Sequence, residues 1–393
     1  MIIQDFLIAL YSMGFMGIGQ YMILLILSGI LLIRKQLILH TDFWILLLFS
    51  GVYFLFSGIS TGNFSYNIFF APLAYLVGLN YRAKSDPSVI ARLILLLAIF
   101  FASHGVLNFL YDTAINGGLN SSSALHNDIW SKSYTSVTGQ MMEYIILAAM
   151  TGYAVFVPKK RWLYPLLAFS MFHTIIVGGR TLIVLMPISL LIGCITYFTV
   201  CKENRGRKLC SFFITLVLLC GIVYLAYNRN ILGIKDTFES SYLYRRLFSD
   251  YASGQDMSFF QTNRWEIKWE FVKLLPYHLL GGRHIHHAVG YYAHDIWLDT
   301  YDTAGIFAFA ILVIYIGKML RRYITMLRSG TTSWEMKIML NCFYIIVMIY
   351  FFIEPVLQCG PYIVFAVFMV DGCVTNYLSN PNASLPDCEA ITL

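Results

Sequence analysis

Apolar segments recur along the whole chain, separated by short polar stretches. Many run for about 18 to 25 residues, the length a helix needs to cross a hydrocarbon layer of about 30 Å. Their apolar residues are continuous, whereas barrel strands would alternate. The pattern predicts an all-α polytopic membrane protein with about 11 or 12 transmembrane helices. The predicted spans are 6–33, 43–59, 66–80, 90–110, 138–157, 162–177, 181–201, 209–227, 296–320, 337–353 and 361–377.

Lysine and arginine gather in alternate connections between these spans, as is typical of cytoplasmic loops. The connection at 60–65 has neither residue, and the one at 112–137 has only Lys132. We therefore expect an external N-terminus and a cytoplasmic C-terminus; a missed span near the N-terminus would put both inside. The clusters are Arg34 and Lys35; Arg82, Lys84 and Arg92; Lys159, Lys160 and Arg161; Lys202, Arg205, Arg207 and Lys208; and Lys318, Arg321, Arg322 and Arg328.

This topology predicts three parts: an N-terminal transmembrane bundle at 1–227, a large external loop at 228–295, and C-terminal transmembrane helices at 296–393. Within the loop, the stretch NRWEIKWEFVKLLPYHLLGG places Trp265, Trp269, Val272 and Leu275 at helical spacing. This spacing predicts an amphipathic helix that lies on the membrane or docks on the bundle, with most of its charges on a solvated face.

The composition excludes several classes of chemistry. The chain is 58% hydrophobic and 12% charged, and its net charge of +6 follows the loop bias, so it does not indicate nucleic-acid binding. The eight cysteines form no C-x-x-C pair, which argues against a metal or disulfide framework. Phosphate-binding loops of the G-x-x-x-x-G-K-[ST] and G-x-G-x-x-G kinds are also missing, as is a D-x-D pair. A bond-forming reaction would therefore need a substrate that arrives already activated, and transport would need a gradient or exchange.

Ionisable residues inside spans are candidates for function, because burying them in a membrane is costly. Arg180 follows two glycines where a span starts; it is either a bidentate anion ligand or an arginine that extends to the interface. Glu143 is a second candidate for substrate binding. His104, Glu143, His173 and Arg180 lie in the outer halves of their spans, and Asp371 does not.

The external loop holds further candidates for substrate binding. Arg264 stands at the start of the predicted helix, and Arg245, Arg246 and Arg283 are other basic residues of the loop. The stretch GGRHIHH has three histidines in four residues, but their spacing matches no zinc pattern. We therefore expect no metal there, and interpret the stretch as a flexible or substrate-contacting loop.

The stretch YYAHDIWLDTYDTAG at 291–305 contains Tyr291, His294 and three aspartates just before an apolar span, and Tyr291 and Asp295 are further candidates for substrate binding. Asp295, Asp299 and Asp302 are in the first turns of the predicted helix, where carboxylates suit the positive end of the helix dipole. That end disfavours a charged histidine. A neutral imidazole facing external solvent is a plausible general base, so His294 is the leading catalytic candidate.

Three segments, in order, resemble the bacterial O-antigen polymerase and O-antigen ligase family, the Wzy-type polymerases and their ligase relatives. They are GGRTLIVL at 178–185, NRWEIKWEFVKLLPYHLLGG at 263–282 and AHDIWLDTYDTAGIFAF at 293–309. The resemblance covers about 178–320, and before that only hydrophobicity is shared. Asp295 departs from the Asn, Ser or Gln that often follows the histidine, and could raise the pKa of His294 or orient its ring. GGRH also departs from the usual Gly-x-Gly.

The resemblance implies a glycosyltransferase of GT-C-like architecture that joins undecaprenyl-diphosphate-linked oligosaccharide repeat units at the periplasmic face of the bacterial inner membrane. It implies that Arg180 and Arg264 hold the diphosphate and that His294 deprotonates the acceptor hydroxyl, with no metal or other cofactor. Implied partners are the lipid-linked oligosaccharide and membrane lipid, and the resemblance allows a chain-length regulator.

Two alternatives stay open. A ligase that transfers the polymer to lipid A-core would use the same three motifs. A flippase for the same lipid-linked oligosaccharide belongs to a different class; it predicts broken helices, paired charges near the membrane midplane and internal repeats.

Overall fold

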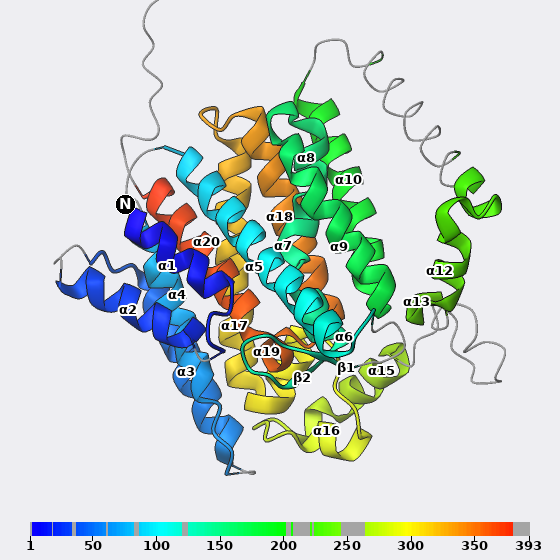
Figure 1. Cartoon of the computed structure of the whole chain (residues 1–393). Helices are drawn as coiled ribbons and strands as arrows, with labels where there is room; N and C mark the ends of the chain where they lie inside the picture. The colour runs from blue at the N-terminus through cyan, green and yellow to red at the C-terminus, as the bar shows by residue number, and fades with distance from the viewer. Residues whose placement is uncertain are drawn as a thin grey trace, which may run out of the picture. The chain divides into compact units, whose positions relative to one another are not determined.

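The computed structural model describes residues 2–17, 19–33, 37–59, 62–81, 86–119, 125–201, 206, 221, 224–244 and 264–379 (Figure 1). The chain forms two compact units. The first comprises residues 1–101, 263–340 and 344–393, and the second comprises 102–262 and 341–343.

The first unit is helical in its described residues. It contains part of α5 (Ser88–Ile115) and most of α18 (Trp334–Ile353). Its other elements are α1 (Ile2–Ser12), α2 (Gly19–Ile33), α3 (Thr41–Ile59), η1 (Tyr66–Phe69), α4 (Phe70–Leu79), α15 (Arg264–Leu274), η5 (Leu275–Tyr277), α16 (His284–Val289), α17 (Ile296–Arg328), α19 (Val356–Cys359) and α20 (Pro361–Leu378).

The second unit combines helices with a small antiparallel hairpin, in which His126 pairs with Thr135. The remainder of α5 belongs to this unit. Its other elements are β1 (Leu125–Asn127), β2 (Tyr134–Ser136), α6 (Val137–Met142), α7 (Ile145–Ala149), α8 (Thr151–Phe156), η2 (Pro158–Leu163), α9 (Tyr164–Val177), α10 (Arg180–Val200), η3 (Ile231–Gly233), α12 (Ile234–Ser240) and α13 (Tyr242–Tyr244).

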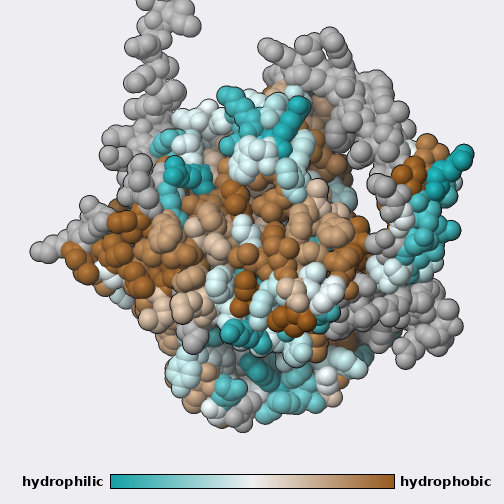
Figure 2. Space-filling view, viewed as in Figure 1, coloured by the Kyte–Doolittle hydropathy of each residue, from teal (hydrophilic) through white to brown (hydrophobic). Residues whose placement is uncertain are grey.

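Six helices among the described residues are long and apolar enough to cross a membrane: α3, α5, α10, α17, α18 and α20. The chain is therefore a multi-pass membrane protein. Figure 2 shows hydrophobic side chains over α1 and α2 and hydrophilic ones over α16, all in the first unit.

Some predicted spans differ from the helices that form. The predicted span 6–33 is two helices, α1 and α2, joined by a turn, and 66–80 contains η1 and the short α4. The predicted span 138–157 is broken into α6, α7 and α8, although nearly all of its residues are buried. Buried surroundings allow such breaks, because freed backbone groups can find partners inside the protein. Most of the predicted span 209–227 lies outside the described residues.

Glycines allow α4 and α20 to pack closely in the first unit (Figure 1). A Cβ atom added to Gly78 would lie 1.8 Å from the carbonyl oxygen of Met369, and one added to Gly372 would lie 2.2 Å from that of Tyr75. Small residues at both contact points let the two backbones touch, as is typical of helix packing in membranes.

Buried ion pairs join other helices of the first unit. The Arg322 guanidinium on α17 contacts Asp42 of α3 and Asp371 of α20, with its Nε 2.9 Å from Asp371 Oδ1. Lys318 also contacts Asp42, and the Tyr315 hydroxyl donates to Asp371 at 2.7 Å. The two fully buried carboxylates are thus balanced by two cations, as burial in a low dielectric requires.

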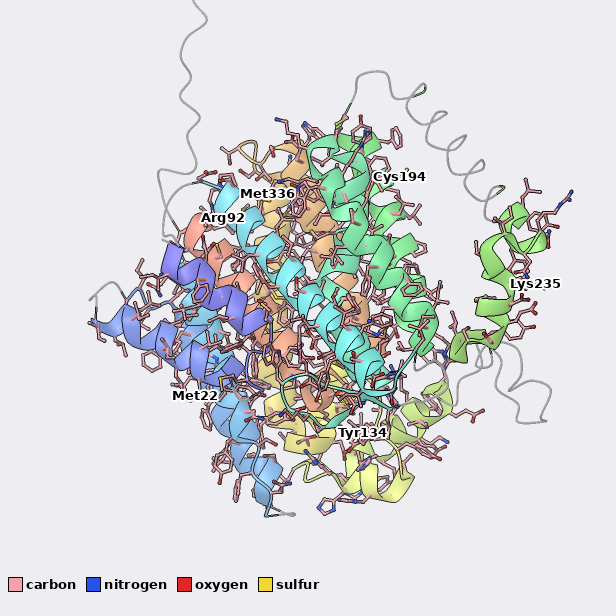
Figure 3. All side chains as sticks on the ribbon, viewed as in Figure 1. Met22, Arg92, Tyr134, Cys194, Lys235 and Met336 are labelled. Carbon is pink, nitrogen blue, oxygen red and sulfur yellow. The ribbon has the colours of Figure 1, made fainter. Side chains whose placement is uncertain are left out.

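Another ion pair in the same unit connects α1 with α5. Arg92, labelled in Figure 3, reaches Asp5 with an Nη2–Oδ2 distance of 2.6 Å. The Tyr81 hydroxyl donates to the other oxygen of Asp5 at 2.6 Å. Arg92, which the sequence indicates only as part of a cytoplasmic cluster, therefore also has a structural partner.

Candidate functional site

The candidate site lies in the first unit, where the chain approaches α17. Asp295 is the N-cap of this helix, because its carboxylate accepts a hydrogen bond from Leu298 N at 2.7 Å. Such a cap satisfies one of the backbone donors left open at a helix start. The predicted helix-start role of Asp295 is confirmed, and His294 comes directly before it.

Lys268 of α15 holds Asp295 from the other side. Its Nζ lies 3.0 Å from Asp295 Oδ2 and donates to the carbonyl oxygen of Phe352 at 2.5 Å. Burial raises the pKa of the Asp295 carboxyl, although the positive charge of Lys268 opposes that shift. One ammonium group thus connects α15, the start of α17 and the end of α18.

His294 has a left-handed backbone, with φ at 57°. Non-glycine residues adopt this region rarely, and histidine is among those that do so more often. Both neighbours of His294 are held: the N–H of buried Ala293 donates to Asp299 Oδ1 at 3.2 Å, and Asp295 is the N-cap of α17. The backbone of His294 is therefore positioned by packing of both neighbours, while its side chain is half-buried.

The other two aspartates do not cap their own helix. Asp302 instead accepts hydrogen bonds from Ile285 N at 2.9 Å and His286 N at 3.3 Å, so it caps α16. Asp299 holds Ala293, as described, and its other oxygen is buried with no hydrogen-bond partner among the described residues. The predicted helix-start position is confirmed for Asp299, which lies in the first turn of α17, and Asp302 lies in the second turn. Both carboxylates also bind the segment that precedes the helix.

A turn rich in glycine joins α15 to α16. Gly281, Gly282 and Arg283 have φ values of 76°, 85° and 60°, so three successive residues are left-handed. Their conformation brings Gly282 N within 3.1 Å of the carbonyl oxygen of Thr303 and Arg283 N within 2.7 Å of that of Asp302. Glycine at the first two positions allows this turn without a steric penalty. The turn fixes the backbone of Arg283 beside Asp302 and Thr303, in the second turn of α17.

The same turn fills a break in α17. Gly305, with φ at 76° and ψ at −178°, divides this helix into residues 296–304 and 306–328. Ile306 N, released by the break, donates to the carbonyl oxygen of Leu279 at 2.9 Å. A Cβ atom on Gly281 would lie 2.5 Å from Gly305 N, so only glycine permits this contact. The candidate site therefore precedes a short helix of its own, which is separated from the apolar part of α17.

The histidines of GGRHIHH lie on α16, a short helix rather than the predicted loop. The His286 ring stacks on Tyr292 with centroids 4.2 Å apart, and His284 stacks on His278 at 5.5 Å. No group of His, Cys, Asp or Glu side chains among the described residues could hold a metal ion. Tyr291, a predicted substrate-binding residue, is exposed beside this helix.

The arginines predicted to bind the substrate lie in different parts of the structure. Arg264 is the first residue of α15, as the sequence predicts, and Arg180 is the first residue of α10. Arg180 belongs to the second unit, whereas Arg264, Arg283 and His294 belong to the first. Arg245 and Arg246 lie outside the described residues.

Glu143 belongs to a separate buried network in the second unit, at the break between α6 and α7. His104 Nδ1 lies 3.1 Å from Glu143 Oε1, and its Nε2 lies 3.2 Å from Asp128 Oδ2. Burial alone would raise the pKa of the Asp128 carboxyl, but its hydrogen bonds with His104 and Ser131 hold that pKa below the usual range. Each ring nitrogen of His104 therefore lies next to a carboxylate.

His173 and Asp371, the other candidates inside predicted spans, also have hydrogen-bond partners within the protein. The Tyr144 hydroxyl lies 2.8 Å from His173 Nδ1 in the second unit. Asp371 contacts Arg322 in the first unit. Both side chains are buried, so these contacts give each of them a structural role.

Sequence patterns did not single out Lys268, which was expected on a solvated helix face. Its side chain is only 17% exposed and pairs with Asp295. Nothing in the spacing of the helix distinguishes it from Lys273, which forms an exposed pair with Glu270. The distinguishing signal is three-dimensional, because Asp295 lies 27 positions away along the chain.

The site combines three chemical properties. His294 offers an imidazole on a positioned backbone, Arg283 carries a guanidinium on a fixed turn, and Tyr291 is an exposed aromatic side chain. An imidazole and a guanidinium are the groups that proton abstraction next to an anionic group requires.

Comparison with known proteins gives no family for the chain. No family model matches it, and no curated protein matches it either.

Proposed function

We propose that this protein is a polysaccharide polymerase that joins oligosaccharide repeat units carried on undecaprenyl diphosphate. The observation that carries the proposal is His294, held in a left-handed conformation between two anchored residues at the start of α17. Strained backbone positions that are fixed by their surroundings cluster at functional sites. The proposed reaction takes place at the periplasmic face of the inner membrane.

In the proposed step, the acceptor hydroxyl oxygen attacks the anomeric carbon of the donor sugar. The bond between that carbon and the diphosphate oxygen breaks, and its electron pair stays on the diphosphate. His294 takes the hydroxyl proton, which is worth about 10²–10⁴-fold in rate for a general base. An activated donor of this kind supplies the energy, which agrees with the absence of nucleotide-binding motifs from the sequence.

Arginines stabilise the leaving diphosphate in this proposal. Arg264 and Arg180 take this role from the family resemblance, and Arg283 is a further cation whose backbone the glycine turn fixes. A guanidinium can bind two phosphate oxygens at once. Lys268 is excluded from this role, because Asp295 and a backbone carbonyl already occupy its ammonium group. A ligase that transfers the polymer to lipid A-core would use the same residues.

A flippase for the same lipid is the second candidate function. It is favoured by the broken helix α6–α8 and by the buried His104 between two carboxylates, because transporters often bind substrates at interrupted helices. Under this alternative, Glu143 and His104 would carry the activity, and His294 would be dispensable.

The test is reconstitution of the full chain in vesicles with a synthetic undecaprenyl-diphosphate oligosaccharide, without nucleotide. Products are separated by size. We expect a ladder of polymers, with formation reduced about 10²–10⁴-fold by His294→Gln. His287→Ala is the matched control, because this histidine is exposed on neighbouring α16, and it should retain the ladder.

Each alternative predicts a different result. Undiminished polymer from His294→Gln would refute the general-base role. Transfer only to added lipid A-core would identify a ligase. Movement of a fluorescent lipid-linked oligosaccharide across the bilayer, without new glycosidic bonds and lost in Glu143→Gln, would identify a flippase.

A further inference from the structure

Helix α15 has two apolar faces, and only one of them packs inside the protein. Phe271 is fully buried with Ile285 and Ala293, and Ile267 and Leu274 pack against the same cluster. Of the four residues predicted from spacing to form the apolar face, Leu275 packs against this cluster. The other three, Trp265, Trp269 and Val272, lie on the other side of the helix and are exposed. Trp265 is 75% exposed and Trp269 is 61% exposed.

We propose that this outer face of α15, defined by Trp265, Trp269 and Val272, lies on the surface of the lipid bilayer. Large exposed apolar patches usually mark a site of interaction. Tryptophan is especially suited to a membrane surface, since its ring is apolar and its N–H can remain near water. The proposal goes beyond the proposed function and does not depend on it.

The patch continues from α15 towards a membrane-spanning helix. After α15, the exposed apolar side chains are those of Tyr277, Leu279 and Leu280. The carbonyl of Leu279 accepts the hydrogen bond from Ile306 N, so this turn is attached where the apolar part of α17 begins. The apolar surface of α15 and its turn therefore leads directly to a helix that crosses the bilayer.

One face of α17 after the break is apolar and exposed. Ile306 and Phe307, just after the break, and Val313 and Ile314, seven residues further on, share one helix face. In a membrane-spanning helix, such a face contacts lipid acyl chains. After the break this helix is apolar from Ile306 to Gly317, a length of about 18 Å at 1.5 Å per residue, and its charged residues begin at Lys318. The turn at 277–280 is therefore attached to the lipid-facing part of α17, and this continuity is the argument for a lipid partner.

Charges on α15 are arranged to allow this contact. Glu270 and Lys273 form a pair on a flank of the helix, 2.7 Å apart, and Glu266 is on the same flank. Lys268 is turned towards Asp295. The outer face itself therefore carries no unbalanced charge, and the helix can rest on the bilayer surface with its charged flank in water.

Photo-cross-linking tests the proposal. Trp269→p-benzoylphenylalanine is introduced into the full chain, which is reconstituted in vesicles of phosphatidylethanolamine and phosphatidylglycerol. Glu270→p-benzoylphenylalanine is the matched control, because the neighbouring residue is exposed on the charged flank. Phe307→p-benzoylphenylalanine, on the exposed face of α17, reports lipid contact. Mass spectrometry detects phospholipid adducts after illumination.

We expect phospholipid adducts from positions 269 and 307, with at least about tenfold less from position 270. Adducts from position 307 alone would overturn the proposal. Equal adducts from 269 and 270 would also overturn it, since the helix would then have no preferred face. A cross-link from 269 to a second protein chain would show that the face binds protein and not lipid.

Discussion

The break in α17 makes a direct prediction about Gly305. Gly305→Ala adds a Cβ atom 2.6 Å from the carbonyl oxygen of Leu279 and 2.7 Å from the carbonyl carbon of Leu280. Both neighbours are backbone atoms, so they cannot turn away as a flexible side chain could. In addition, the backbone conformation at this position, with φ at 76° and ψ at −178°, is unfavourable for alanine.

The magnitude follows from these two effects. Forcing a residue with a Cβ atom into a region reserved for glycine costs about 1–3 kcal/mol. Moving the turn away from the helix breaks the hydrogen bond from Ile306 N to Leu279, which contributes about 1 kcal/mol. We therefore expect Gly305→Ala to lower the free energy of unfolding by about 2–4 kcal/mol.

Gly317 provides a matched control in the same helix. It is exposed, a Cβ atom there meets nothing within 4 Å, and its backbone is helical. Gly317→Ala should therefore stabilise the protein by about 0.5–1 kcal/mol, the usual gain for alanine inside a helix. The measurement is unfolding by sodium dodecyl sulfate in mixed micelles, followed by circular dichroism. If Gly305→Ala were as stable as Gly317→Ala, α17 would be a continuous helix and the break would be refuted.

Three other substitutions test the packing and the charges. Gly78→Ala should destabilise the protein by about 3 kcal/mol or more, because it forces α4 from α20, whereas Gly29→Ala, in open space, should not. Asp371→Ala should cost about 3 kcal/mol by the same assay, since it leaves Arg322 with half of its buried partners. Asp128 has a lowered pKa, so its stabilisation is complete above about pH 4 and is lost gradually as pH falls towards the lowered pKa; Asp128→Asn should lower the thermal midpoint most at pH 7 and by a smaller amount at pH 3.

The hydrophobic pattern predicts a helix well where a membrane span is one unbroken helix. The predicted spans 43–59 and 337–353 correspond to α3 and α18 within three residues at each end. The predicted span 138–157 fails, because continuous hydrophobicity indicates burial but not an unbroken backbone. The breaks in α6–α8 and at Gly305 depend on partners from other parts of the chain, such as the Leu279 carbonyl. The local hydrophobic pattern therefore cannot predict them.

The candidate site was predictable in part. The sequence places His294 directly before a helix and identifies Asp295 as a helix-start residue, because N-caps follow local rules. Asp302 caps α16 although it comes 17 positions after Ile285, so no capping rule applied along the sequence could find it. The roles of His294 and of the arginines in substrate binding stay predictions.

The buried charges of the first unit also constrain how the chain enters the membrane during synthesis. An aspartate near the middle of a helix raises the free energy of insertion by about 3 kcal/mol, and Asp371 occupies such a position in α20. Its partner Arg322 is on α17, which leaves the ribosome earlier. Stable insertion of α20 therefore depends on α17 being already in place, so that Arg322 can pair with Asp371.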